Sequence, residues 1–346
     1  MQQARATLDA FRERADARLE ELFASWRRRA LPGTARPAPG DLVEAVADLT
    51  RRGGKRLRPA LAFHAACCFD HDLDEAALLD ACLGVELLQT YLLIHDDVMD
   101  GDAERRGGPS VHVVLARLAG SDETGRSLAI LAGDLACALS QELLLHPALP
   151  PERARAAAWE LFRMQWEVIQ GQLLDLVGGA DPLDVHDAKT ASYTTRGPVR
   201  LGAALAGAAQ PQVAALERYG TPLGRAFQVR DDLLGTFGKQ ADLGKPVGSD
   251  LRAGKRTSLV RAALDRADAA QRAAILDVLG RPGATDAQIA SACSAIEATG
   301  ARQHEEALIE SLTAEALAAL DTADGLREVG RAFLRGVALL LADRDR

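Results

Sequence analysis

The sequence lacks any run of about 18 uncharged apolar residues, the length that a membrane-spanning helix needs. Its best candidate, residues 127–140, is interrupted by Asp134. The first residues, MQQARATLDAFRERADARLEEL, mix acids with arginines and lack the apolar block of a signal peptide. We therefore expect no membrane span and a cytoplasmic location.

Cysteine is scarce, and its spacing suits neither metal binding nor a disulfide framework. The five cysteines include no CxxC pair, and no histidine stands at zinc-finger spacing from them. Because they lie in segments rich in alanine and leucine, we interpret them as small core residues. The net charge of -8 argues against nucleic acid as a partner.

Strand patterns are also lacking, since no stretch alternates Val, Ile and Thr with polar residues. Strong helix formers fill the segments between Gly- and Pro-rich turns, and apolar residues recur at three- and four-residue spacing. Several segments are apolar on all sides, which is typical of central helices ringed by others. The expected fold is all-α: a single-domain bundle around an apolar cavity over residues 1–346, with residues 1–40 an N-terminal helix and linker. Its long helices are predicted at 4–30, 74–100, 124–147, 151–177, 185–207 and 211–235.

Three carboxylates stand where one of these apolar helices ends, in the segment LIHDDVMD at 93–100. Asp96 and Asp100 are four residues apart and share a helix face, with Asp97 beside them. A helix C-terminus disfavours negative charge, so an exposed acidic helix end is the weaker interpretation. Oxygen ligands of this kind suit Mg²⁺ held by one or two carboxylates together with substrate phosphates.

A second acidic pair, Asp231 and Asp232, ends another apolar segment, FQVRDDLLG. Four residues after Asp231 stands Gly235, so one carboxylate of the first pattern is missing. The following segment at 244–255 alternates glycines with cations, as a phosphate-binding loop needs. It lacks the spacing of a nucleotide P-loop.

Lysine is rare in this sequence, because arginine supplies most of the basic residues. Only five of the 41 basic residues are lysine, and four of them, Lys55, Lys189, Lys245 and Lys255, lie in glycine- or hydroxyl-bearing segments. A chain that prefers arginine elsewhere keeps a compact ammonium at these candidate phosphate sites. Arg105 and Arg106, just beyond the first acidic cluster, add forked donors that suit a diphosphate.

These motifs together resemble those of the trans-isoprenyl diphosphate synthases, also called polyprenyl synthetases, from about Asp41 to Arg346. The matching motifs are GGKRLRP (53–59), LIHDDVMD followed by RRG (93–107), GQLLDL (171–176), KTASYT (189–194), FQVRDDLLG (227–235) and GKPVGSDLRAGKRT (244–257). The resemblance implies the isoprenoid synthase fold and Mg²⁺-dependent prenyl transfer. An allylic diphosphate loses its diphosphate, the double bond of isopentenyl diphosphate attacks the resulting cation, and a proton is lost.

The resemblance also implies roles for individual residues, with three Mg²⁺ ions per active site bridging the carboxylates and the diphosphate. The metal ligands are Asp96, Asp100 and Asp231, supported by Asp97 and, through metal-bound water, Asp232 and Asp250. The isopentenyl diphosphate residues are Lys55, Arg58, Gln89 and Arg106. The allylic diphosphate residues are Arg105, Lys189, Lys245 and Lys255, with Thr190 and Gln228 near the developing cation. Taken singly, Gln89 could be an ordinary helix residue and Arg58 or Arg106 a surface charge.

Product length in this family depends on the floor of an apolar tunnel below the first aspartate motif. Tyr91 and Leu92 stand five and four residues before Asp96, and DDVMD carries no two-residue insertion. An aromatic followed by leucine favours the twenty-carbon geranylgeranyl product, with farnesyl second. The alternative is that Tyr91 is an ordinary core residue.

Two other functions stay open on the sequence. A class I terpene cyclase also uses an all-α bundle and DDxxD, but its second metal motif is of an Asn/Ser/Glu type. A non-catalytic partner of a related synthase is suggested only by Gly235, where many members carry aspartate. The family resemblance further implies a homodimer.

Overall fold

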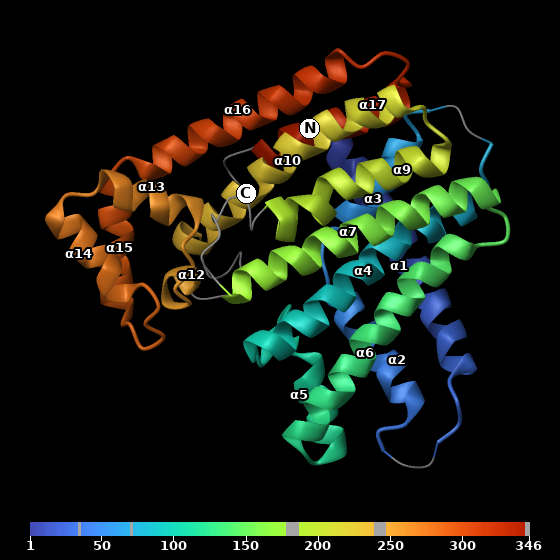
Figure 1. The fold of residues 1–346 in the computed structure, drawn as a ribbon, viewed down its shortest axis with the longest axis horizontal. Coiled ribbons are helices and arrows are strands. Elements are labelled where there is room, and N and C mark those ends of the chain that lie inside the picture. The colour runs from blue at the N-terminus through green and yellow to red at the C-terminus, as the bar shows by residue number, and fades with distance from the viewer. Residues whose placement is uncertain (34–35, 70–71, 178–186, 239–246, 343–346) are drawn as a thin grey trace. The chain divides into compact units, whose positions relative to one another are not determined.

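A computed structural model of the chain describes residues 1–33, 36–69, 72–177, 187–238 and 247–342, without the side chains of 187–191. Helices make up most of these residues (Figure 1). The elements are α1 Gln2–Arg29, α2 Pro39–Arg51, α3 Leu57–Ala66, α4 Glu75–Asp100, β1 Glu104–Arg105, β2 Gly108–Pro109, α5 Val111–Ala119, α6 Asp122–Glu142, η1 Leu143–Leu145, α7 Pro151–Val177, the π-helical η2 Asp187–Arg196, α9 Gly197–Ala206, α10 Gln210–Phe237, α12 Ser249–Arg252, α13 Ser258–Arg266, α14 Ala269–Val278, α15 Asp286–Ala298, α16 Ala301–Asp321 and α17 Glu328–Ala342.

The chain forms two compact units. Unit 1 consists of Met1–Gln165, Gly197–Leu216 and Asp324–Gly336, and unit 2 of Trp166–Arg196, Glu217–Ala323 and Val337–Arg346. Helices α7, α10 and α17 contribute residues to both units. The single domain over 1–346 and the central cavity stay predictions.

The all-α fold is confirmed, and the predicted long helices correspond to α1, α4, α6, α7, η2 with α9, and α10. One segment differs from the lack of strand patterns in the sequence. Between α4 and α5, Glu104–Arg105 pairs antiparallel with Gly108–Pro109. Two-residue strands are too short to show alternation, and Arg106 and Gly107 form the connecting turn.

Helix α4 is the core of unit 1. Every residue from Ala77 to Leu88 is buried, so the helix contacts neighbours around its whole circumference. It begins at the N-cap Asp74, whose side chain accepts a hydrogen bond from Ala77, and ends at Gly101 with a φ of 70°. Helices α2, α3, α5, α6 and α9 all pack against it. This burial fixes the position of the aspartates at its C-terminal end.

Two glycines permit close approach between helices of unit 1. A Cβ at Gly84 on α4 would lie 2.8 Å from the carbonyl oxygen of Ser140 on α6. A Cβ at Gly202 on α9 would lie 2.0 Å from the carbonyl oxygen of Ala62 on α3. Since either contact is too short for a side chain, glycine lets these helix pairs pack backbone to backbone.

Unit 2 has its own apolar core. Helices α13 to α16 surround a cluster in which Leu259, Ile275, Ile289 and Ile309 are almost fully buried. Buried residues of α10 such as Val229 belong to the same cluster. The second aspartate pair follows directly on that part of α10, so the core of unit 2 fixes its position.

Within the described residues, two helices, α4 and α6, are long and apolar enough to cross a membrane by length and composition alone. The apolar window of α4 is 78% buried within the protein, which is typical of the core helix of a globular protein. That of α6 is 44% buried, because residues such as Ile130 and Leu131 face outward. The cysteines are free, as expected, and Cys68 and Cys82 are buried.

Candidate active site

The first aspartate cluster occupies the last turns of α4. Asp96 is partly buried, Asp97 is fully buried and Asp100 is exposed. Gln89 stands seven residues before Asp96, so it shares the helix face of Asp96 and Asp100. The structure therefore presents two carboxylates and one amide on one face of α4, of which the sequence analysis placed the two carboxylates there.

Asp97 is neutralised by Arg105 from strand β1. The Arg105 Nε donates to Asp97 Oδ1 at 2.6 Å, and its Nη2 contacts the same oxygen. Nη2 also lies 3.0 Å from Asp102 and 3.8 Å from Asp96. Burial raises the pKa of Asp97 to about 6, and the Arg105 guanidinium acts against that rise. Arg105 thus already binds carboxylates in this structure, and its role at the allylic diphosphate stays a prediction.

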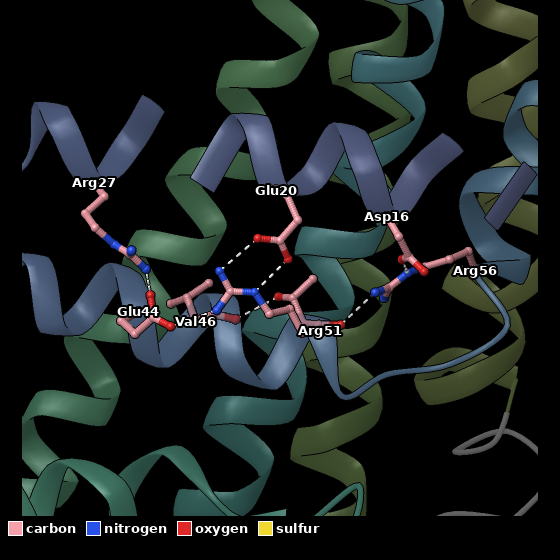
Figure 2. Close-up of polar contacts among 8 residues, drawn as sticks. Asp16, Glu20, Arg27, Glu44, Val46, Arg51 and Arg56 are labelled. Atoms are coloured by element: carbon pink, nitrogen blue, oxygen red, sulfur yellow. Dashed lines mark hydrogen bonds and ion pairs between the residues drawn. The ribbon is translucent and has the colours of Figure 1, made fainter. Parts of the chain in front are cut away.

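The GGKR loop lies between α2 and α3 and is anchored by Arg56. This buried guanidinium donates to Asp16 on α1 at 2.7 Å, to Glu86 on α4 at 2.6 Å and to the Thr50 carbonyl at 2.8 Å. Figure 2 shows the contact with Asp16, beside the separate pairing of Arg51 with Glu20. Arg56 has a φ of 51°, an unfavourable backbone conformation that these three bonds maintain.

The loop thereby presents the residues predicted for isopentenyl diphosphate in unit 1. Lys55 is exposed, and Arg58 is partly buried on the first turn of α3. Arg106 reaches this loop from the β1–β2 hairpin, and its Nη1 lies 3.4 Å from the Leu49 carbonyl oxygen. A Cβ at Gly53 would lie 1.6 Å from that nitrogen, so Gly53 provides the space for Arg106. These contacts bring Arg106 and the GGKR loop together.

Tyr91 and Leu92 lie on different faces of α4. Leu92 stands one turn before Asp96 and shares its face, whereas Tyr91 shares the face of His95. The Tyr91 ring contacts the His95 ring edge to face, with centroids 4.9 Å apart. Burial raises the Tyr91 pKa, and Cys137 and Asp134 of α6 raise it further, so this side chain faces α6. Its role in product length stays a prediction.

The second aspartate pair lies near the C-terminal end of α10 in unit 2. Asp231 is exposed, and Asp232 is buried, with Oδ1 accepting a hydrogen bond from Gln228 Nε2 at 2.8 Å. Burial raises the pKa of Asp232 to about 7, and the carboxylates of Asp250, Asp231 and Glu305 add to the rise. A bound divalent cation would favour the ionised form of this acid. Gln228 positions Asp232 here, a contact that the sequence did not reveal.

Gly235 is explained by Asp250. A Cβ at position 235 would lie 2.1 Å from Asp250 Oδ2 and 3.0 Å from its Cγ. The Asp250 carboxylate, from α12, therefore occupies the space where a side chain at 235 would begin. It pairs with Lys255 Nζ at 3.3 Å. We infer that this carboxylate, which comes from another segment, replaces the one that the second motif lacks.

Three predicted diphosphate-site residues have no described side chain. Lys245 lies outside the described residues, and the side chains of Lys189 and Thr190 lie outside them too. Residues that the sequence did not single out include Arg52, Gly53, Asp102 and Gly108. The sequence feature that could have pointed to the arginines and glycines is the motif RRGG, which occurs at 51–54 and again at 105–108.

The donors fit a divalent metal ion that also binds substrate oxygens. No group of three or more potential ligands lies together among the described side chains. Asp96 and Asp100 offer two carboxylates from one face of α4, and within the described part of the chain no donor reaches Asp97 Oδ2. Mg²⁺ keeps several positions for water or phosphate oxygens, so two carboxylates suffice on the protein side.

Comparison with known proteins identifies the family. The sequence model of the polyprenyl synthetase family matches residues 40–296. The chain belongs to the polyprenyl synthetase family. It is 34% identical over 278 residues to the short chain isoprenyl diphosphate synthase of Methanothermobacter thermautotrophicus, covering 78% of this chain and 81% of that protein. Identity with the geranylgeranyl diphosphate synthase of Sulfolobus acidocaldarius is 35% over 266 residues, covering 74% and 77%.

A solved polyprenyl synthetase structure has the same fold. The geranylgeranyl pyrophosphate synthase of Corynebacterium glutamicum, complexed with isoprenyl diphosphate and magnesium, is similar with a TM-score of 0.87 and 34% identity, over 97% of this chain and 99% of that one. As a member of the family, this protein is a prenyltransferase that makes a short-chain prenyl diphosphate. Its substrates are isopentenyl and allylic diphosphates, and it depends on a divalent metal.

We expect Gly235→Ala to weaken metal-dependent turnover. The added Cβ would displace the Asp250 carboxylate and break its contact with Lys255, because that short side chain has little room to move. The concentration of Mg²⁺ that gives half-maximal activity should rise about tenfold, as a misplaced catalytic group implies. Gly283→Ala, also in unit 2, is the matched control because nothing lies within 4 Å of its Cβ. Equal Mg²⁺ dependence in the two variants would contradict the replacement of the missing carboxylate by Asp250.

Proposed function

We propose that this polyprenyl synthetase makes geranylgeranyl diphosphate. It would add isopentenyl diphosphate to an allylic diphosphate until a twenty-carbon chain is reached. The length is supported by Tyr91 and Leu92 before the first motif and by the absence of an insertion within DDVMD. A farnesyl product is the second candidate. We place the reaction in the cytoplasm.

The single observation that carries the proposed mechanism is the set of carboxylates on one face of α4. Mg²⁺, three ions in our proposal, would supply Lewis acidity and neutralise the charge of the leaving diphosphate. Asp96 and Asp100 would bind Mg²⁺ on unit 1. There, Asp97 Oδ1 accepts a hydrogen bond from Arg105 Nε at 2.6 Å and so keeps Arg105 in place. Asp231 would bind Mg²⁺ on unit 2, where Asp232 and Asp250 are the supporting carboxylates.

Cations of the same chain would bind the diphosphates. In our proposal, Lys55, Arg58, Arg106 and the amide of Gln89 bind isopentenyl diphosphate, and the anchored loop around Arg56 supports this because it presents Lys55 to solvent. The residues proposed for the allylic diphosphate are Arg105, Lys189, Lys245 and Lys255, with Thr190 and Gln228 near the cation. No nucleophilic side chain takes part, since ionisation, attack by the double bond and loss of a proton complete the reaction.

We expect Asp96→Ala and Asp231→Ala each to reduce turnover by at least about a hundredfold, because each removes a direct metal ligand. Thermal melting should stay close to that of the wild type, since neither carboxylate is buried. Asp134→Ala on α6 is the matched control, an exposed carboxylate outside the motifs that should leave activity unchanged. Near-normal turnover in either motif variant would refute the metal assignment.

The same assay separates the candidate functions. Purified protein is incubated with Mg²⁺, isopentenyl diphosphate and each of the three short allylic primers, and products are identified by chromatography. Consumption of both substrates indicates the synthase. Diphosphate release from the allylic substrate alone indicates a cyclase, and no turnover without another subunit indicates a non-catalytic partner.

We expect Tyr91→Ala to lengthen the product, because it removes the aromatic ring proposed as the tunnel floor. The measurement is the chain-length distribution from geranyl and farnesyl primers. Leu92→Ala is the informative companion, since Leu92 shares the face of Asp96 whereas Tyr91 faces His95. Longer products from Leu92→Ala with an unchanged distribution from Tyr91→Ala would transfer the role to Leu92.

We further propose a homodimer, supported by exposed apolar side chains on unit 1. Ile130 and Leu131 of α6 are 48% and 54% exposed, and Trp159 and Phe162 of α7 are 64% and 48% exposed. Ile130 and Leu131 are adjacent, and the Trp159 and Phe162 rings lie 5.4 Å apart, so each helix carries an exposed apolar pair of the kind found at protein interfaces. Light scattering should give about twice the chain mass of 36.8 kDa. A mass of one chain at micromolar concentration would contradict the dimer.

A further inference from the structure

The β1–β2 hairpin presents Arg106 in a conformation that an arginine rarely adopts. Arg106 and Gly107 have φ angles of 53° and 72°, so the two residues between the strands both lie in the left-handed region. This is the pattern of a type I′ turn, where asparagine or aspartate is usual before glycine. A non-glycine residue in that region is strained, so the surrounding contacts must stabilise it.

Arg52 supplies those contacts from the end of α2. Its Nη1 donates to the Arg105 carbonyl at 2.7 Å, and its Nη2 donates to the Pro109 carbonyl at 2.9 Å. The two acceptors stand on opposite strands of the hairpin, on either side of the turn. Nη2 also pairs with Asp48, one turn earlier on α2, at 2.9 Å. A single forked side chain thus joins both strands to α2.

Two glycines provide the space for two arginines that cross between the segments. A Cβ at Gly108 on β2 would lie 2.4 Å from Arg52 Nη1 and 3.1 Å from its Cζ. In the opposite direction, Arg106 lies over Gly53, where a Cβ would be 1.6 Å from Nη1 and 2.2 Å from Cζ. We name Arg52, Gly53, Arg106 and Gly108 the arginine clasp.

We infer that Arg52 is a positioning residue for isopentenyl diphosphate. It holds the β1–β2 hairpin against the GGKR loop, so that the Arg106 guanidinium stays beside the loop that carries Lys55. The inference rests on the proposed role of Arg106 and Lys55 in binding that substrate. Arg52 itself acts through the two carbonyls and not on the diphosphate.

The first test is Arg52→Ala in the full-length enzyme. Loss of the two carbonyl contacts should raise the KM for isopentenyl diphosphate roughly tenfold, while kcat and the KM for the allylic substrate change by less than about twofold. Arg52→Lys should give an intermediate KM, because one ammonium cannot reproduce the planar fork. Arg51→Ala is the matched control.

Arg51 is the neighbouring arginine with partners of a different kind. Its Nε and Nη2 donate to Glu20 of α1 at 2.7 and 3.0 Å, and its Nη1 donates to Glu44 at 2.7 Å (Figure 2). These three hydrogen bonds match in number the two hydrogen bonds and one ion pair of Arg52, but all three go to carboxylates of α1 and α2. Arg51→Ala should therefore leave the KM for isopentenyl diphosphate unchanged. An equal rise in both variants would overturn the inference.

The second test uses the space at Gly108. Gly108→Ala should raise the same KM with Arg52 still present, because the new Cβ displaces the guanidinium. In the double variant Arg52→Ala/Gly108→Ala the clash is absent, so its KM should equal that of Arg52→Ala alone. Such non-additivity is the signature of direct contact. Effects that multiply would overturn the inference, as would a fall in melting temperature and kcat with the KM unchanged.

Parallel measurements on Lys55→Ala and Arg106→Ala separate this inference from the proposed site. If both raise the KM for isopentenyl diphosphate and Arg52→Ala does not, the clasp is wrong and the substrate site stands. If neither raises it, the assignment of the substrate site is wrong, whatever Arg52 does.

Discussion

A carboxylate buried away from water needs a cation beside it, and in unit 1 Asp97 is such a carboxylate. The end of α4 is fixed by its packing, so Asp97 stays in the interior and draws Arg105 to within 2.6 Å. Arg105 belongs to β1, so the ion pair also fixes the hairpin, and the hairpin in turn sets Arg106 over Gly53. The same ion pair therefore supports both the aspartates at the end of α4, Asp96 and Asp100, and the arginines beside them. Asp97, which looks redundant in the motif, therefore determines where Arg105 and Arg106 lie.

Much of the fold could be predicted because it depends on local composition. Helix formers and apolar periodicity identified six long helices but not the 21-residue α16, and the motifs identified the family and its reaction. Gln89, Asp96 and Asp100 could be placed on one face because helical spacing alone decides it. Comparison then confirmed a synthase of short-chain prenyl diphosphates.

The rest depended on contacts between distant segments, which spacing does not encode. Nothing in the sequence indicates that Arg52 reaches the carbonyls of Arg105 and Pro109, or that Arg56 rather than Lys55 is the buried cation of GGKR. Tyr91 was placed below Asp96 by counting residues along the chain, whereas its ring lies toward His95 and α6. In each case the direction of a side chain, and not its position in the sequence, decides what it contacts.

The Asp250 carboxylate beside Gly235 bears on how sequences of this family are interpreted. Taken alone, the letters of the second motif leave it one carboxylate short. In three dimensions, the carboxylate of a residue fifteen positions later occupies the space beside Gly235. Positions 235 and 250 are therefore sterically coupled, because any side chain at 235 requires the carboxylate at 250 to move.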